Sequence, residues 1–301
     1  MPAIQINSLS KRYGSKTILS DISCSFQSGH IYGLVGNNGA GKTTLFRILA
    51  GLVRPTTGSF SIFGETTESG LRKSRKRIGF LIEDPFFYPS INAVHNLEAI
   101  QLLYGPADKR RITDVLKLVG LNPDSRQKLH SFSLGMKQRY GIALALIHDP
   151  DILILDEPLN GLDPSGSLEI NSLIKQLCQQ GKTVIMSSHL LAELSKTATD
   201  YIFMDHGQIL EQLTHEALVS KCNYQMIVRC ANPDQISSLL QSAYPECKLE
   251  FAEDYLIVHK CPSTPDAINK VLSNAKLEYQ IETSGINLEN YFFALLDGCK
   301  S

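Results

Sequence analysis

Short apolar runs alternate with longer segments of helical spacing up to about residue 220 of the chain. Ile31 to Val35 is one such run, and apolar residues with helical spacing follow it at positions 45, 46, 49 and 52. Ile152 to Leu155 is continuously apolar, as expected of a strand covered on both faces, and the runs 183–187 and 201–204 are of the same type. This order predicts an α/β fold with a parallel sheet and crossover helices.

The region from residue 87 to about residue 150 lacks a comparable strand pattern. Its apolar residues have helical spacing, and the segments Gly105-Pro106 and Leu121 to Asp124 interrupt it. We therefore expect a helical insertion within the α/β core.

The pattern changes again after about residue 222, where short strands and helices are predicted. In chain order they are a strand over 224–228, a helix over 234–242, strands over 248–251 and 255–259, a helix over 265–275, a strand over 279–282 and a helix over 288–296. The first six follow the β-α-β-β-α-β order of a ferredoxin-like, α+β domain. With 301 residues, the chain is expected to form two domains, residues 1–220 and 222–301. A regulatory or dimer-supporting role and a mere packing appendage both remain open for the second.

Composition limits the classes of partner. The 29 Lys and Arg residues balance 30 Asp and Glu residues, so the chain as a whole does not attract nucleic acid or anionic lipid. The basic run at positions 72–77 is either a solvated surface or a contact for anionic headgroups or an acidic partner. No run of 18 apolar residues occurs, so we expect no membrane-spanning segment.

The seven cysteines are scattered and form no C-x-x-C pair. Neither a disulfide framework nor a zinc site is indicated, and reduced thiols in a cytoplasmic protein are expected.

Residues 36–43 match the phosphate-binding pattern G-x-x-x-x-G-K-[ST] between a predicted strand and a predicted helix. Its glycines let the backbone curl so that successive N–H groups point at one anion, and the helix adds its positive end. Lys42 would reach the β- and γ-phosphates, and the Thr43 hydroxyl would bind Mg²⁺. The residues expected at the nucleotide are Gly36, Asn37, Asn38, Gly39, Ala40, Gly41, Lys42, Thr43 and Thr44.

An acidic pair follows the apolar strand at 152–155. Asp156 and Glu157 stand at the carboxyl end of that strand, where α/β proteins bind ligands. Asp156 would hold Mg²⁺, and Glu157 would polarise the attacking water as a general base. Because such pairs are common in loops, this interpretation depends on the phosphate-binding loop.

Further motifs follow in a definite order. Residues 132–139 are F-S-L-G-M-K-Q-R, Pro158 follows the acidic pair, Gly161-Leu162-Asp163 comes next, and His189 follows the strand predicted at 183–187. Together with the phosphate-binding loop, this order resembles the nucleotide-binding subunit of ABC transporters over about residues 3–215. The resemblance implies a P-loop ATPase fold of the ABC type that binds ATP and Mg²⁺.

The resemblance also implies a dimer. Ser133 and Gly135 keep the hydroxyl and the second glycine of the family's signature loop, L-S-G-G-Q, whereas Leu134 and Met136 depart from it. In the family this loop meets the γ-phosphate of ATP held by the other subunit, so two copies would pair head to tail. Asp163, in the segment called the D-loop, would line the same interface.

Two further roles follow from the resemblance. His189, as the family's switch histidine, would hydrogen-bond the γ-phosphate and act in catalysis with Lys42 and Glu157. Tyr13 fits the aromatic residue that stacks on adenine.

Glu83 stands where ABC subunits usually carry glutamine, between the sheet and the helical insertion. With Pro85 and Tyr88 after it, it resembles the exporters of lantibiotic immunity and bacitracin resistance, and the signature run and the tail at 291–293 are similar to that subgroup too. Because a carboxylate only accepts hydrogen bonds, Glu83 would bind Mg²⁺ or its water, or alter how nucleotide state reaches a membrane partner. A solvated surface glutamate is the alternative.

The resemblance therefore implies the ATP-hydrolysing subunit of an exporter of antimicrobial peptides. Its permease subunits would be integral membrane proteins on separate chains, and this chain would be peripheral on the cytoplasmic face of the membrane. A soluble ABC ATPase acting on ribosomes or DNA is the alternative, but the chain has one P-loop and no extended heptads, and no nucleic acid partner is expected. A GTP switch would need an N-K-x-D motif, which is absent from the sequence.

Overall fold

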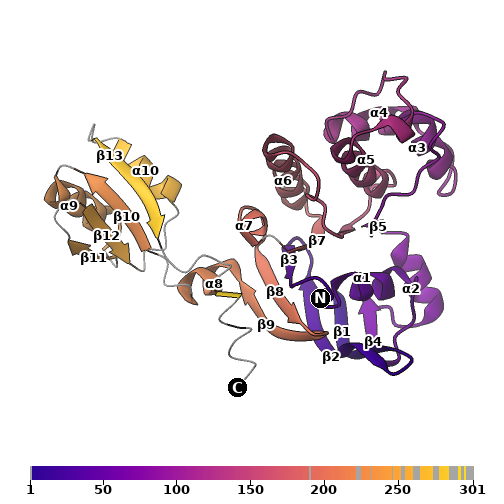
Figure 1. Cartoon of the computed structure of the whole chain (residues 1–301), viewed down its shortest axis with the longest axis horizontal. Helices are drawn as coiled ribbons and strands as arrows, with labels where there is room; N and C mark the ends of the chain where they lie inside the picture. Colours follow the sequence, from indigo (N-terminus) through magenta and orange to yellow (C-terminus); the bar gives the residue numbers. More distant parts are fainter. Residues whose placement is uncertain are drawn as a thin grey trace. The chain divides into compact units, whose positions relative to one another are not determined.

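The structure, a computed structural model, describes residues 2–189, 191–221, 225–230, 232–245, 247–251, 255–259, 265–273, 278–284, 291–292 and 295. It divides into two compact units, Met1–Gln212 and Leu213–Ser301 (Figure 1). The boundary falls within strand β9 (Gln208–Thr214), a few residues before the one predicted at 220–222.

The first unit is built on a six-stranded sheet with the order β5-β6-β7-β3-β8-β9. The pairs from β5 to β8 are parallel, as the apolar runs predict. Every residue of β3, β6 and β7 is buried, which is the pattern of strands covered on both faces. The strands are β3 (Ile31–Val35), β5 (Ile78–Leu81), β6 (Ile152–Leu155), β7 (Thr183–Ser188), β8 (Asp200–Asp205) and β9 (Gln208–Thr214).

A second sheet in this unit was not predicted from the sequence. It is antiparallel, with the order β2-β1-β4, and consists of β1 (Pro2–Tyr13), β2 (Lys16–Gln27) and β4 (Thr57–Ile62). Ile4, Ile6 and Leu9 of β1 are fully buried, but register shifts on both sides of Leu9 interrupt the pairing with β2. These irregularities break the two-residue period by which a half-buried strand is recognised.

The helices of the first unit are α1 (Lys42–Ala50), α2 (Glu68–Arg75), α3 (Ala93–Gln101), α4 (Lys109–Leu118), the short 3₁₀ helix η1 (Leu129–Ser131), α5 (Leu134–Leu146), α6 (Pro164–Gln179) and α7 (Leu191–Leu194). Residues 87–150, all of them described, contain helices and no strand, in line with the expected insertion. Figure 1 shows α3, α4 and α5 gathered beyond β5. Polar side chains begin these helices: Asn92, Asp108 and Ser133 each accept a backbone N–H of the first turn.

The second unit contains α8 (His215–Lys221) and a four-stranded antiparallel sheet with the order β11-β12-β10-β13 (Figure 1). Its chain order is β10 (Gln225–Cys230), α9 (Pro233–Ala243), β11 (Lys248–Phe251), β12 (Tyr255–His259), α10 (Pro265–Ser273) and β13 (Tyr279–Ser284). A small core forms between the sheet and these helices, with Val228, Leu240, Leu256 and Leu272 buried in it. The helix expected over 288–296 lies mostly outside the described residues, of which Tyr291, Phe292 and Leu295 are helical.

The basic run at 72–77 contributes to packing in the first unit. Arg75 donates to the carbonyl of Leu49 at 2.8 Å, and Arg77 forms an ion pair with Asp151 at 2.7 Å. Among the helices of the described residues, none has both the length and the apolar character needed to cross a bilayer.

Among the described cysteines, Cys247 differs from the expectation. Cys24, Cys178 and Cys230 are free thiols, whereas Cys247 is in a disulfide bond. The expectation that all the thiols are reduced is therefore wrong for Cys247.

Candidate nucleotide-binding site

The loop of residues 36–43 joins β3, in the middle of the sheet, to the first turn of α1. Gly41 precedes the helix with φ of 103°, and a Cβ at this position would lie 2.6 Å from Cδ2 of Leu19. Since Gly41 offers no side chain to cap α1, the N–H groups of the first turn have no side-chain cap. The loop and the positive end of α1 therefore provide donors for an anion.

Residues that are distant in the sequence form hydrogen bonds and packing contacts with this loop. The N–H of Gly207, in the turn between β8 and β9, donates to the carbonyl of Ala40 at 3.1 Å. The carbonyl of Gly207 accepts the N–H of Ser20 at 2.8 Å, and a Cβ on Gly207 would collide with the carbonyl of Ile18. Both β2 and the β8–β9 turn thus fix the shape of the loop, and neither belongs to the sequence motif.

Lys42 is buried, with 5% of its surface exposed. Its Nζ donates to the carbonyl of Gly36 at 2.5 Å and to that of Asn37 at 3.3 Å, and lies 3.7 Å from Oε1 of Glu157. Burial lowers the pKa of Lys42, while the carboxylates of Glu157 and Asp156 raise it. A buried ammonium at the start of α1 is placed to bind an added negative charge.

Asp156 follows β6 and accepts hydrogen bonds at both carboxylate oxygens. The Thr43 hydroxyl donates to Oδ2 at 2.7 Å, and the Ser187 hydroxyl donates to Oδ1 at 2.6 Å. The structure thus brings Thr43 and Asp156 together, as the predicted metal site requires. Ser187, at the end of β7, was missed, because within an apolar strand a serine carries no signal of its own.

Both the backbone and the side chain of Glu157 have partners in other elements. Its N–H donates to the Ser187 hydroxyl at 2.9 Å, and its carbonyl accepts Nε2 of Gln138 at 3.0 Å. In the side chain, Oε2 lies 2.8 Å from Nδ1 of His189 and Oε1 faces Lys42. Lys42, Glu157 and His189, which come from three separate parts of the sequence, therefore form one cluster.

The pair of Thr43 and Asp156 fits a metal that arrives with a nucleotide. Within the part of the chain that the structure describes, no three His, Cys, Asp or Glu side chains gather as a metal site. Mg²⁺ at nucleotide sites takes one or two protein ligands and completes its shell with phosphate oxygens and water. The Thr43 hydroxyl and the Asp156 carboxylate supply that number of ligands.

Other predicted residues lie at the rim of the site. Tyr13, at the end of β1, is 46% exposed, with Nζ of Lys11 4.7 Å above its ring. Asn37, Asn38 and Gly39 are exposed, Gly36, Ala40 and Gly41 are buried, and Thr43 and Thr44 are half-buried. An accessible ring at Tyr13 leaves a face free for stacking.

Glu83 is largely exposed and pairs with an arginine of α1. Its Oε1 accepts Nη2 of Arg47, on α1, at 2.5 Å, and its side chain is 56% exposed. This hydrogen bond raises the pKa of Arg47. Among the described hydrogen bonds, none joins Glu83 to Thr43 or Asp156. The carboxylate is therefore the partner of an arginine in this structure.

The signature loop lies beside the D-loop. The Ser133 hydroxyl accepts the N–H of Met136 at 3.2 Å and so caps α5, and Asp163 caps α6 by accepting the N–H of Gly166 at 3.1 Å. A Cβ on Gly135 would lie 3.3 Å from the carbonyl of Gly161. No hydrogen bond in the described part of the chain joins Ser133, Gly135 or Asp163 to residues 36–44.

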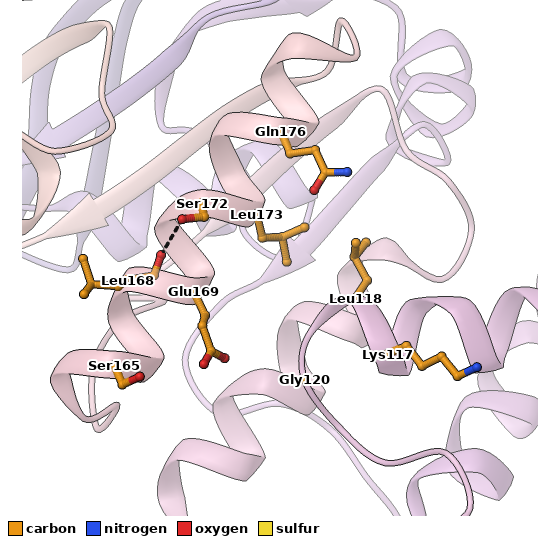
Figure 2. Close-up of a pocket in the computed structure, with 9 residues that line it drawn as sticks. All are labelled: Lys117, Leu118, Gly120, Ser165, Leu168, Glu169, Ser172, Leu173 and Gln176. Carbon is orange, nitrogen blue, oxygen red and sulfur yellow. Dashed lines mark hydrogen bonds between the residues drawn. The ribbon is translucent and has the colours of Figure 1, made fainter.

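A groove lies elsewhere in the first unit, between the end of α4 and the side of α6 (Figure 2). Lys117, Leu118 and Gly120 line one side, and residues of α6, among them Leu168 and Glu169, line the other. None of the residues of the Lys42–Glu157–His189 cluster lines this groove, so it is separate from the nucleotide site.

A glycine loop on the central strand, a buried lysine and a hydroxyl–carboxylate pair beside it define a P-loop nucleoside triphosphate hydrolase. The family model described as ABC transporter matches residues 19–160. The bacitracin transport ATP-binding protein BcrA of Enterococcus faecalis is 33% identical over 297 residues, which are 98% of this chain and 96% of the relative. The chain belongs to the ABC transporter family and is one of its ATP-binding, ATP-hydrolysing subunits.

Further relatives agree with this membership. BcrA of Bacillus licheniformis is 35% identical over 298 residues, 98% of this chain and 97% of the relative. The lantibiotic transport ATP-binding protein SrtF of Streptococcus pyogenes is 39% identical over 207 residues, 69% of this chain and 89% of the relative. The resemblance inferred from the motif order is confirmed, and the alternative of a ribosome- or DNA-directed ATPase is not favoured.

Solved structures share the fold. The dimeric post-hydrolysis structure of the ATP-binding cassette MJ0796, bound to ADP and Pi, has a TM-score of 0.65 and 25% identity, and the match covers 70% of this chain and 98% of that chain. A structure of the ATP-binding subunit of an ABC transporter has a TM-score of 0.66 and 26% identity, covering 73% and 92% of the two chains.

Proposed function

We propose that this chain hydrolyses ATP for an exporter that confers resistance to bacitracin- or lantibiotic-type antimicrobial peptides. The observation that carries the proposal is the likeness to bacitracin transport ATP-binding proteins over almost the whole chain, second unit included. The cluster of Lys42, Glu157 and His189 provides the chemistry such a subunit needs.

The residues around the P-loop would hold the substrate. The N–H groups of residues 36–44 and the ammonium of Lys42 bind the phosphates, and Tyr13 stacks on the adenine. Thr43 and Asp156 would hold Mg²⁺, which when bound neutralises the charge of the β- and γ-phosphates.

Glu157 serves as the general base. His189 engages one carboxylate oxygen, so the carboxylate has a defined orientation and the other oxygen faces Lys42. The proton of the attacking water passes to Glu157, while Lys42 and His189 stabilise the charge on the transferred phosphoryl group. The role of general base requires a carboxylate at position 157.

The catalytic unit would be a head-to-tail dimer of two copies. Ser133, Gly135 and Asp163 would complete the site of the second copy, and this is supported by the exposure of Ser133, Leu134 and Asp163 on the first. The solved relative MJ0796 is itself dimeric.

Membrane subunits on separate chains would carry the exported molecule, with this subunit peripheral on the cytoplasmic face. Glu83, exposed and paired with Arg47 at the start of the helical insertion, couples the nucleotide state to them. Residues 1–220 would form the nucleotide-binding domain, with its helical subdomain at about 87–150. Residues 222–301 would form an accessory domain of the ferredoxin-like type, which its β-α-β-β-α-β order supports.

The Glu157→Gln variant tests this function. ATP binding is retained, because glutamine keeps the shape of the side chain, and hydrolysis falls at least about tenfold since the base is lost. In cells that also express the permease subunits, resistance to bacitracin falls with it. Glu169→Gln, an exposed change on α6, is the control and retains both activities. Unchanged turnover in Glu157→Gln would remove Glu157 as the base, and unchanged sensitivity to peptides on deleting the gene would remove the exporter role.

A further inference from the structure

The backbone of Glu157 has an unusual conformation and two unusual partners. Its φ is 49°, in the left-handed region that residues with a side chain rarely adopt. The Ser187 hydroxyl accepts the N–H on one side of the residue, and the Gln138 amide donates to the carbonyl on the other. Side chains from two other elements therefore fix the peptide groups that aim this carboxylate.

The second partner comes from the helix that the signature loop begins. Gln138 lies on α5, whose first turn Ser133 caps, and it is 8% exposed. Its Nε2 lies 3.0 Å from the Glu157 carbonyl. A rotation or shift of α5 would therefore act directly on the backbone of Glu157.

We propose that Gln138 is a positioning residue that makes the placement of Glu157 depend on the signature helix. The inference rests on the proposed function of Glu157 as the general base and of the signature loop as a contact for the second copy's nucleotide. Occupation of one nucleotide site then stabilises α5 in the position in which Gln138 holds the base of the other site. The hydrogen bond from Gln138 to Glu157 links the two sites of the dimer.

Besides Gln138, the helix α5 has other attachments to its neighbours. Arg139, the next residue, donates through Nη1 to the carbonyl of Val119 at 2.8 Å and to Glu169 at 2.9 Å. These bonds attach α5 to the end of α4 and to α6. Replacement of Gln138 therefore removes the link to Glu157 while the helix keeps other attachments.

A double-mutant cycle on the full-length protein with its permease subunits tests the link. Gln138→Met keeps the length and burial of the side chain but cannot donate. We expect kcat for ATP to fall at least about tenfold, because a slightly misplaced base is inefficient, while KM stays within about twofold. In the Glu157→Gln background the same change lowers kcat less than about twofold, since there is no base left to position.

The matched control is Glu169→Gln, which removes the charge from an attachment of α5 and leaves the bond to Glu157 intact. It leaves kcat within about twofold in both backgrounds. Gln138→Asn, whose amide is too short to reach, keeps a polar side chain at this position, repeats the loss and serves if Gln138→Met does not fold.

Two results would overturn the link. One is that Gln138→Met lowers kcat equally in the wild-type and Glu157→Gln backgrounds. The other is that Glu169→Gln lowers kcat as much as Gln138→Met does, or that Gln138→Met changes KM and not kcat. If instead Glu157→Gln alone leaves kcat unchanged, the proposed base is wrong, so the two failures are distinguishable.

Discussion

Two helix starts in the first unit, those of α1 and α5, differ in what they offer to an anion. At α1 the cap is Gly41, no side chain takes the first N–H groups, and the buried Lys42 adds a positive charge. At α5 the cap is Ser133, whose hydroxyl already accepts the N–H of Met136, and the exposed Leu134 follows it. The first start therefore leaves its N–H groups available to an anion and adds a positive charge, whereas the second uses a side chain to cap its first turn.

The difference indicates how the proposed two-copy site would be divided between the two regions. The Gly207 turn and β2 contact the P-loop and fix its shape, so this shape does not depend on a second copy of the chain. Beside the signature loop, Gly161 of the D-loop lies against Leu134 and Gly135. We therefore expect changes in the first region to affect ATP binding and changes in the second region to affect the rate of ATP hydrolysis.

The largest effect should come from the first region. Lys42→Met removes the buried ammonium, and ATP affinity should fall about 10- to 100-fold, because hydrogen bonds to charged groups are worth about 1.5–3 kcal/mol. Lys137→Met, at the start of α5, is the matched control and should change the affinity less than about twofold. Titration of the purified subunit with a fluorescent ATP analogue measures both. Equal losses in the two variants would abolish the distinction between the helix starts.

An intermediate effect should come from the second region. Ser133→Asp keeps a good cap on α5, so the melting temperature and ATP affinity should be retained. The added negative charge would meet the phosphates held by a second copy, and hydrolysis should therefore fall at least about tenfold. Steady-state ATPase rates measure the change in hydrolysis, and thermal melts measure the change in melting temperature. Full activity in Ser133→Asp would mean that no phosphate approaches this helix.

The smallest effect should come from the ion pair between α1 and the segment that follows β5. Glu83→Gln weakens an exposed pair with Arg47, and exposed pairs contribute about 0.2–1 kcal/mol, so stability and ATP affinity should change little. Transport, measured as resistance in cells, should change, because Glu83 lies between β5 and the helical insertion and pairs with Arg47 on α1. A collapse of ATP binding in the purified Glu83→Gln subunit would contradict the coupling role.

The sequence predicts those parts of the fold and site that local patterns encode. The strands at 31–35 and 152–155 have the predicted bounds, because buried parallel strands are continuous apolar runs. The P-loop and the acidic pair were placed at the ends of these strands by motif alone. The first unit's antiparallel sheet escaped prediction, because the bulges around Leu9 disturb its alternation.

Other parts of the site depend on contacts between distant residues. Ser187 and Gln138 matter through the single atoms they present to Asp156 and Glu157, and neither has a local pattern that marks this. Glu83 is the opposite case: its chemistry suits a metal, but Arg47 lies close enough to engage it. The chemical roles open to a side chain can be assigned from its residue type, whereas the partner of a charged side chain can be identified only from the fold.

The pairing of β3 has a consequence for synthesis of the protein. Its two neighbours in the sheet are β7 and β8, which begin about 150 residues after β3 ends, so the strand that carries the phosphate loop emerges from the ribosome long before they do. During that interval an apolar strand has both edges open, which is the condition under which nascent chains aggregate or recruit chaperones. The nascent polypeptide acquires affinity for nucleotide only in the last stage of making its first unit.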